Sequence, residues 1–263
     1  MTRLGQNFLI DRTVLGKIAA AARPPNGAIL IEIGPGHGEL TDELRRRYPA
    51  VPLIAIEKDL TLAKTLATRR ADDTLFKLQE GDVRQLLPSL VSERTAPNKP
   101  YVVAGNIPYY LTGFLFRLLG ELLPRPKCIV LTIQKEVAER VAAQPPQMNR
   151  LAASIQFWAW PTIKDIIPKK AFRPVPKVDS AILLLEPHPL SADDMPAEAY
   201  YELVRVLFQQ PRKTILNNLC ARYPKDDVQH ELERLGLDQN LRPQNLDTIA
   251  IRELARGLAK REL

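Results

Sequence analysis

The chain has 263 residues, which is enough for one large domain or for a large and a small domain. Hydrophobic residues make up 45% of it and charged residues 25%, a composition that excludes disordered and collagen-like proteins. Two cysteines, Cys128 and Cys220, are too few for a disulfide framework or a zinc cluster. We expect no signal peptide, and the apolar runs fall short of the roughly 18 residues that a membrane span needs. We therefore expect a cytoplasmic protein without a membrane partner.

The first part of the chain carries the positive charge. Lys and Arg number 37 against 30 Asp and Glu, a net charge of +7. Residues 188–263 hold 11 Lys and Arg against 12 Asp and Glu, so the excess lies within residues 1–187. Such an excess suits a phosphate backbone as partner, although solvated enzymes without a nucleic-acid partner are often equally basic.

A helix is predicted over residues 13–22, because Asp11 offers an N-cap and apolar residues recur at helical spacing up to the stop at Pro24. After it, strands and helices alternate. The strands are predicted at 28–33, 52–57, 75–79, 101–105 and 128–133, and the helices at 39–48, 60–70, 83–91 and 113–123. This alternation predicts an α/β fold with a doubly wound, Rossmann-like parallel sheet that has helices on both faces.

The pattern changes in the second half of the chain. Helices predicted at 134–143 and 151–158 precede two β-like runs at 162–167 and 178–185, which can pair antiparallel at the edge of the sheet. Residues 186–191 have the composition of a linker, and only helical patterns follow, at 200–209, 213–221, 228–235 and 248–260. We therefore predict a Rossmann-like domain over residues 1–187 and a small α-helical C-terminal domain over residues 188–263.

A glycine-rich turn joins the first of the alternating strands to its helix. Gly34, Gly36 and Gly38 have the spacing G-x-G-x-G, and glycines there let a ligand approach the backbone closely. Glu57 ends the next strand, 19 residues beyond Gly38, where a carboxylate can accept both hydroxyls of a ribose. The turn and the acid fit NAD or S-adenosylmethionine equally well, and the turn alone also suits a tight connection that binds no ligand.

Two further strand ends carry polar side chains. Asp82 follows the strand at 75–79, where it can accept a hydrogen bond from an adenine amino group or cap the next helix. The tetrapeptide Asn106-Ile107-Pro108-Tyr109 follows the strand at 101–105, at the edge where open α/β sheets bind ligands. An NAD enzyme has no use for this tetrapeptide.

An enzyme that methylates an aromatic amine does have a use for it. The lone pair of such an amine is delocalised into the ring, and hydrogen-bond acceptors aimed at its N–H groups favour the nucleophilic form. The side-chain oxygen of Asn106 and the carbonyl of Ile107 can be these acceptors, Pro108 fixes the turn, and the ring of Tyr109 can stack on the base. The tetrapeptide therefore favours an amine methyltransferase over an NAD dehydrogenase or a plain turn.

Taken together and in this order, the motifs resemble those of the KsgA/RsmA family of ribosomal RNA adenine dimethyltransferases. The motifs are Leu4 to Leu9, the glycine turn, Glu57, Asp82, Asn106 to Tyr109, Gln134 to Arg140 and Phe172 to Ser180. The resemblance implies a class I methyltransferase fold with S-adenosyl-L-methionine as cofactor. It also implies methyl transfer to the exocyclic amine of two adjacent adenosines near the 3′ end of 16S rRNA in the small ribosomal subunit, giving N(6)-dimethyladenosine.

The resemblance also implies roles for single residues. The cofactor site is expected to be lined by Asn7, Leu9, Gly34, Gly36, Glu57, Asp82 and Asn106. The target adenine is expected to be held by Asn106, Ile107, Pro108 and Tyr109, with Phe172 against its other face. No metal is expected, because the three histidines are scattered along the chain.

Basic residues near the expected pocket mouth are candidates for RNA phosphate contacts. They are Lys169, Lys170, Arg173, Lys177, Arg212 and Lys213, each of which is otherwise an ordinary surface residue. We expect Trp158 and Trp160 to pack in the core. The sequence departs from the family in its short segment before Leu4, in Pro211 where the family has Arg, and in Met148-Asn149-Arg150.

Other functions stay open at this point. The large-subunit relative of the macrolide-resistance type, which acts on 23S rRNA, shares Asn-Ile-Pro-Tyr, but the residues 177–180 and 212–214 favour the small-subunit enzyme. A methyltransferase-like RNA-binding ribosome assembly factor, or a relative of mitochondrial transcription factors, would keep the fold and lose the catalysis. An NAD dehydrogenase is the remaining alternative. We expect a monomer.

Overall fold

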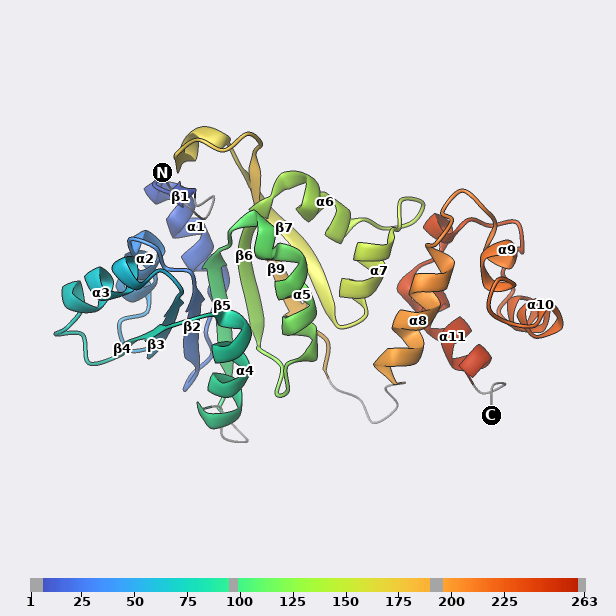
Figure 1. Cartoon of the computed structure of the whole chain (residues 1–263), viewed down its shortest axis with the longest axis horizontal. Helices are drawn as coiled ribbons and strands as arrows, with labels where there is room; N and C mark the ends of the chain where they lie inside the picture. Colours follow the sequence, from blue (N-terminus) through green and yellow to red (C-terminus); the bar gives the residue numbers. More distant parts are fainter. Residues whose placement is uncertain (1–6, 95–98, 190–195, 260–263) are drawn as a thin grey trace. The chain divides into compact units, whose positions relative to one another are not determined.

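The predicted alternation of strands and helices is present in the structure, a computed structural model that describes residues 7–94, 99–189 and 196–259 (Figure 1). The motif residues Leu4, Gly5 and Gln6 lie outside this part. Helix α1 (Arg12–Ala22) comes first, after the short strand β1 (Phe8–Leu9). The alternating elements are β2 (Ile29–Ile33), α2 (Glu39–Arg47), β3 (Leu53–Glu57), α3 (Leu60–Arg69), β4 (Phe76–Glu80), α4 (Val83–Arg94), β5 (Tyr101–Asn106), η1 (Tyr109–Leu111), α5 (Thr112–Glu121) and β6 (Cys128–Gln134).

In the part of the chain that the structure describes, seven strands form the main sheet in the order β4-β3-β2-β5-β6-β9-β7. The first five strands in this order, β4, β3, β2, β5 and β6, are parallel to one another. Strand β9 (Ser180–Pro187) runs antiparallel to β6. Strand β7 (Ala159–Ile167) lies beyond β9. The doubly wound, Rossmann-like fold class is therefore confirmed, and β9 and β7, which overlap the two predicted β-like runs, are neighbours at the edge of the sheet.

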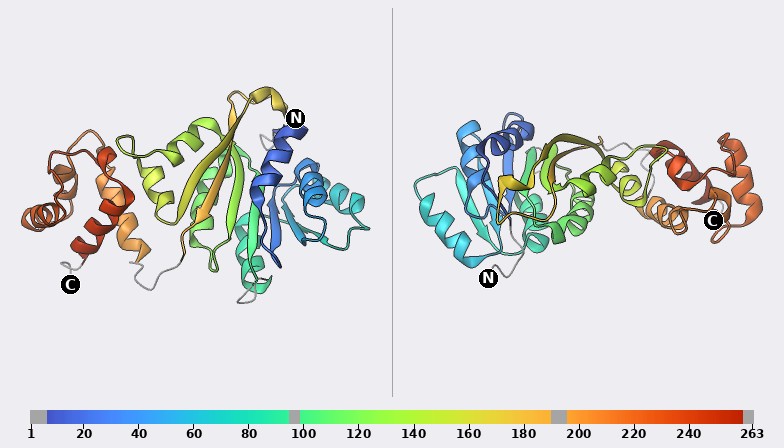
Figure 2. Two further views of the ribbon diagram at one scale, coloured as in Figure 1. Left: turned by 180° about the vertical axis from the view of Figure 1, so that it is seen from behind. Right: turned by 90° about the horizontal axis from the view of Figure 1, so that it is seen from above.

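The order of the strands reverses between β2 and β5. The chain passes from β2 to β3 and β4 on one side, and β5 and β6 lie on the other side. Because crossovers between parallel strands are right-handed, the helices that make these two sets of connections cover opposite faces (Figure 2). Such a switch point opens a crevice at the carboxyl ends of the strands, where ligands bind in open α/β sheets.

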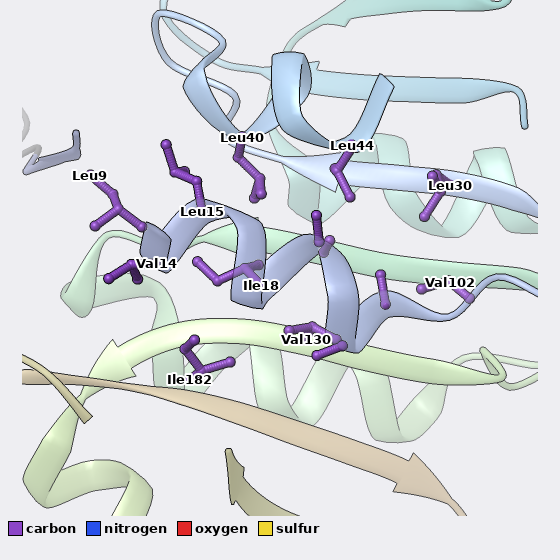
Figure 3. Close-up of a cluster of buried hydrophobic side chains, with 14 of the residues drawn as sticks. Leu9, Val14, Leu15, Ile18, Leu30, Leu40, Leu44, Val102, Val130 and Ile182 are labelled. Atoms are coloured by element: carbon purple, nitrogen blue, oxygen red, sulfur yellow. The ribbon is translucent and has the colours of Figure 1, made fainter. Parts of the chain in front are cut away.

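Apolar spacing along α1 builds the core on one face of the sheet (Figure 3). Asp11 caps the helix by accepting the backbone N–H groups of Thr13 and Val14. Leu15 and Ile18 then face the sheet. They pack in one cluster with Leu40 and Leu44 of α2 and with Leu30, Val102, Val130 and Ile182 of the strands. Strands β2 and β3 are buried along their whole length because helices cover both faces of the sheet.

A second, two-stranded sheet was not predicted. Strand β1 pairs antiparallel with β8 (Phe172–Arg173), with Phe8 opposite Arg173 and Leu9 opposite Phe172. The 3-10 turn η2 (Lys169–Ala171) precedes β8 and accepts a hydrogen bond from the Ile10 N–H at the Ala171 carbonyl, 2.9 Å away. This pairing holds the segment that contains Asn7 against the segment that contains Phe172.

The chain divides into two compact units, residues 1–139 with 160–187 and residues 140–159 with 188–263. The second unit is helical. Its helices are α7 (Arg150–Gln156), α8 (Ala197–Leu207), α9 (Ile215–Leu219), α10 (Lys225–Arg234) and α11 (Thr248–Ala259), with the turn η3 (Pro243–Asn245), and α6 (Lys135–Ala142) leads into it. The Tyr200 hydroxyl of α8 donates to the Ala153 carbonyl of α7 at 2.9 Å, and the rings of Tyr200 and Phe157 stack 4.2 Å apart.

These contacts explain a difference from the predicted domain ranges. Residues 140–159 were placed in the domain at 1–187, but they pack with the helices that follow residue 188. The ranges 1–187 and 188–263 stay a prediction of domain organisation. Of the two tryptophans expected in the core, Trp158 is 2% exposed, whereas Trp160 on β7 is 56% exposed, so the expectation for Trp160 was wrong.

Candidate active site

A cavity of about 430 Å³ opens at the carboxyl ends of β2, β3, β4 and β5. Ten of the predicted site residues line it: Asn7, Gly34, Gly36, Glu57, Asp82, Asn106, Ile107, Pro108, Tyr109 and Phe172. Leu9 does not line it, since its side chain is 2% exposed and packs into the core beside α1. The lining residues that were not predicted are Phe8, Ile33, Ile56, Lys58, Gly81, Val83, Arg84, Tyr110, Leu111 and Phe114.

The glycine turn forms one wall of the cavity. Gly36 has a φ of +59°, in the left-handed region that side chains rarely adopt. A Cβ atom at this position would lie 2.9 Å from the Phe8 ring. The Gly34 N–H donates to the Ile56 carbonyl at 2.9 Å, which ties the turn to the end of β3. Glycine is therefore needed at Gly36 both for the backbone conformation and for the close approach of Phe8.

Glu57 is held in place by backbone donors. Its Oε2 accepts the Gly36 N–H at 3.0 Å, and its Oε1 accepts the Asp59 N–H at 2.9 Å. The residue is 4% exposed. Each carboxylate oxygen can accept a second hydrogen bond, so Glu57 retains the capacity to bind two ribose hydroxyls at the predicted position.

Asp82 lies between two cations and caps α4. Its Oδ1 accepts the Arg84 backbone N–H at 3.0 Å, so the helix-capping interpretation holds. The Arg84 side chain binds both carboxylate oxygens, and the Lys58 ammonium lies 3.1 Å from Oδ2. The Arg84 guanidinium, with the backbone N–H and Lys58, holds the pKa of Asp82 well below its usual value. Lys58 and Arg84 closely follow predicted site residues, and this proximity was the available signal for them.

Asn106 at the end of β5 is oriented by the N-terminal segment. Its Nδ2 donates to the Asn7 carbonyl at 2.9 Å. The Ile107 N–H donates to the Thr132 carbonyl of β6 at 3.3 Å, and the Pro108 carbonyl accepts the Leu111 N–H at 2.9 Å in the turn η1. The tetrapeptide therefore has a fixed backbone, and the side-chain oxygen of Asn106 is the end of the amide that remains as an acceptor.

Two aromatic side chains complete the cavity. The Tyr109 hydroxyl lies 2.8 Å from the Ser180 hydroxyl at the start of β9, and burial raises the pKa of Tyr109. Phe172 is 1% exposed and reaches the cavity from β8. The structure thus brings Tyr109 and Phe172, which are 63 residues apart in the sequence, to the same cavity.

Glu32 lies in β2, two residues before Gly34 of the glycine turn, and was not predicted as a site residue. It is 1% exposed, and its Oε2 accepts the Thr41 hydroxyl of α2 at 2.7 Å. Its Oε1 is buried without a hydrogen-bond partner among the described residues. Burial raises the pKa of Glu32 to about 8, so the carboxyl is mostly protonated at neutral pH.

The predicted RNA-contact residues fall into two groups. Lys169, Lys170, Arg173 and Lys177 are exposed on the segment that contains Phe172. Arg212 and Lys213 are exposed in the second unit. Within residues 7–94, 99–189 and 196–259, no group of three His, Cys, Asp or Glu side chains is placed to hold a metal ion, and no helix is long and apolar enough to cross a membrane.

Comparison with known proteins agrees with this geometry. A family model described as ribosomal RNA adenine dimethylase matches residues 1–256. The ribosomal RNA small subunit methyltransferase A of Geobacillus thermodenitrificans is 35% identical over 97% of this chain and 89% of its own length. The protein of the same name from Prochlorococcus marinus (strain MIT 9303) is 37% identical over 99% of this chain and 95% of its own length.

Two solved structures share the fold over nearly the whole chain. A dimethyladenosine transferase from Plasmodium falciparum superposes with a TM-score of 0.81 and 26% identity, over 97% of this chain and 98% of that one. The 23S rRNA methyltransferase ErmE has a TM-score of 0.76 and 26% identity, over 96% of this chain and all of the other. The resemblance drawn from the motifs and the expected class of enzyme are confirmed. The chain belongs to the ribosomal RNA adenine dimethylase family, and its cofactor is S-adenosylmethionine.

Proposed function

We propose that this enzyme transfers methyl groups to the exocyclic amine of two adjacent adenosines near the 3′ end of 16S rRNA, in the small ribosomal subunit. The product is N(6)-dimethyladenosine. The orientation of Asn106 carries the proposal, because its amide nitrogen is committed to Asn7 and its oxygen is left to accept an N–H group of the substrate. The curated relatives named for the small subunit are 35% and 37% identical, whereas the 23S enzyme ErmE is 26% identical.

The residues around the cavity fit the cofactor. A volume of about 430 Å³ lies in the range of small-molecule sites. The glycine turn leaves room for a ligand against the backbone, and Glu57 retains acceptor capacity for a ribose. We assign cofactor binding to Asn7, Gly34, Gly36, Glu57, Asp82 and Asn106. Leu9 has an indirect role, since it is buried in the core and its pairing with Phe172 holds the cavity-lining segment that contains Asn7. S-adenosylmethionine, when bound, supplies an electrophilic methyl group.

The chain's own task is to orient a weak nucleophile. The Asn106 side-chain oxygen and the Ile107 carbonyl accept the N–H groups of the adenine amine and favour its pyramidal form as positive charge develops on the nitrogen. Pro108 fixes the position of these acceptors. Tyr109 and Phe172 flank the extruded base, and the bond from Tyr109 to Ser180 holds the ring in place. No strong base is required for this alignment.

The second methylation adds one demand to the same site. The monomethylated amine has one N–H group left, and it has to turn so that this group points to the acceptors. The first methyl group then needs space beside them. Leu111 and Phe114 also line the cavity, and their apolar side chains suit a methyl group.

We assign RNA binding to the exposed cations of the segment with Phe172, and to Arg212 and Lys213 in the second unit. Extrusion of a base requires a surface that holds the backbone on either side of the target, and Lys169, Lys170, Arg173 and Lys177 lie on the segment that reaches the cavity. We also propose that the enzyme acts as a monomer in the cytoplasm; in support of a monomer, ten of the predicted site residues line one cavity of a single chain. Light scattering of the purified protein, alone and with cofactor, tests the oligomeric state.

The substrate is tested by incubating the purified protein and labelled S-adenosylmethionine with unmethylated 30S particles and, separately, with 23S rRNA. Mass spectrometry then identifies the modified nucleosides. We expect dimethyladenosine in the 30S sample alone. Label in 23S rRNA alone would assign the enzyme to the macrolide-resistance type, and cofactor binding without label in either RNA would favour an assembly factor.

A further inference from the structure

The carboxylate of Asp82 is saturated by donors of its own chain. A carboxylate offers about four lone-pair positions, two on each oxygen. Oδ1 accepts the Arg84 backbone N–H at 3.0 Å and the Arg84 Nε–H at 2.9 Å. Oδ2 accepts the Arg84 Nη2–H at 2.5 Å and the Lys58 ammonium at 3.1 Å. All four positions are therefore filled by this chain alone.

This saturation conflicts with the role that the proposed function gives to Asp82. That role is to accept a hydrogen bond from the adenine amino group of the cofactor, which would be a fifth donor. The Arg84 backbone N–H belongs to the first turn of α4 and stays with the carboxylate. One of the two cationic side chains must therefore leave Asp82 before the amino group can bind.

The geometry favours the departure of Arg84. Its guanidinium occupies one position on each oxygen, so its departure frees an acceptor on both sides of the carboxylate. The departure of Lys58 would free Oδ2 only. The side chains of Arg84 and Lys58 are 51% and 54% exposed, so either can turn into solvent, and it is the number of acceptors freed that favours Arg84.

We propose that Arg84 is a specificity-determining residue of the cofactor site. In the free enzyme its guanidinium takes the place on Asp82 that the adenine amino group takes in the complex, and it moves off when the cofactor binds. This assignment rests on the proposed function. Its consequence is that a nucleoside displaces Arg84 only if it has an exocyclic amine to bind Asp82.

The test compares two ligands that differ only in that amine. Calorimetry gives the Kd of S-adenosylhomocysteine and of its purine-riboside analogue, which lacks the exocyclic amine, for the wild-type protein and for Arg84→Met. The ligands carry the same charge, so the loss of a cation affects them equally. We expect S-adenosylhomocysteine to bind Arg84→Met about two- to fivefold more tightly than wild type, because an exposed ion pair is a weak competitor. The analogue should bind both proteins equally.

Two results would overturn the proposal. Weaker binding of S-adenosylhomocysteine to Arg84→Met would mean that the guanidinium contacts the bound cofactor, and an equal shift for both ligands would mean that the amine is not involved. Lys58→Met is the matched variant at the second cation. A shift confined to S-adenosylhomocysteine in Lys58→Met, with none in Arg84→Met, would move the role to Lys58 and reject Arg84.

A distant cation controls for net charge. Arg46 on α2 pairs with Glu43 at an exposed position and does not line the cavity, so Arg46→Met should leave both Kd values at the wild-type level. Failure of the wild-type protein to bind S-adenosylhomocysteine at all would contradict the proposed function itself, a result distinct from those that bear on Arg84.

Discussion

The side-chain nitrogen of Asn106 donates a hydrogen bond to the backbone carbonyl of Asn7 at 2.9 Å. The two residues are 99 positions apart, yet this one bond decides which end of the Asn106 amide is left without a bond to Asn7. The nitrogen is committed to the N-terminal segment, and the oxygen remains for the amine in the proposed mechanism. The orientation of a proposed catalytic side chain thus depends on a backbone group of a segment that also lines the proposed cofactor cavity.

Substitution of Asn106 should separate catalysis from binding. Asn106→Ala removes the acceptor and is expected to lower kcat by about 10² to 10³, the cost of losing one oriented group that stabilises a transition state. Asn106→Asp keeps an oxygen but cannot donate to the Asn7 carbonyl, so it should also be impaired. Single-turnover methylation of 30S particles measures the rate, and calorimetry with S-adenosylhomocysteine should show that binding is at least partly kept. Full activity of Asn106→Ala would contradict the assignment.

The glycine turn offers a comparison of two positions with similar backbones. Gly36 and Gly27 have φ values of +59° and +74°, but a Cβ atom at Gly36 meets the Phe8 ring, whereas one at Gly27 meets nothing within 4 Å. Both alanine variants should lose about 1 kcal/mol or more of unfolding free energy through backbone strain. Only Gly36→Ala should also weaken cofactor binding, by about tenfold, because Phe8 lines the cavity and must shift. Equal affinities in the two variants would show that the turn does not shape the cofactor site.

The buried carboxyl of Glu32 should make stability depend on pH. Its pKa is raised by burial from 4.5 to about 8, so the unfolded chain releases this proton at lower pH than the native protein does. The contribution of Glu32 to stability is therefore constant below pH 4.5, falls as pH rises to about 8, and is constant above that. The slope in this window is at most about 1.4 kcal/mol per pH unit.

Glu32→Gln is the variant that reveals this dependence, because glutamine is neutral at every pH. Urea unfolding at a series of pH values should show the wild-type free energy of unfolding declining relative to that of the variant between about pH 5 and pH 8. The comparison uses slopes and not absolute stabilities, since glutamine also places an amide in the buried site. Parallel curves for the two proteins would mean that Glu32 has an ordinary pKa in the native state.

The cations beside Phe172 should affect the salt dependence of RNA binding. Each phosphate contact contributes about 0.7 to 0.9 to the slope of log K against log salt concentration. If Lys169 and Lys170 each contact a phosphate, the double change to Gln should lower the slope measured with unmethylated 30S particles by about 1.4 to 1.8. Lys225→Gln, an exposed change in the second unit, serves as the control and should leave the slope unchanged. An unaltered slope in the double variant would mean that Lys169 and Lys170 are surface residues that contact no phosphate.

The sequence predicted those parts of the site that follow from local rules. Glu57, Asp82 and Asn106 each lie at the end of a strand, and parallel strands bring their carboxyl ends to one edge, so the strand pattern was enough to predict their convergence. The pairing of β1 with β8 could not be predicted in this way, since each strand has two residues and no periodicity marks so short a segment. Phe172 was placed through the family resemblance and not through its pattern.

One wrong expectation and one difference from the predicted domain ranges have physical causes of their own. Trp160 was expected in the core, but side chains alternate along β7, and the position after buried Ala159 points to solvent. Residues 140–159 were assigned to the first domain because the chain contains no linker there. Their apolar side chains are equally compatible with either partner, and only the contacts with α8 show which partner they have.

This last feature limits how the protein can be dissected. The first unit is discontinuous, since the chain leaves it at residue 139 and returns at residue 160. A truncation after residue 187 would therefore retain Phe157 and Trp158 but remove Tyr200 and the rest of α8. The apolar side chains of residues 140–159 that pack against α8 would then be exposed on the fragment. The truncated protein should therefore aggregate. A soluble catalytic fragment would need residues 140–159 replaced by a short loop, in addition to the removal of the C-terminal helices.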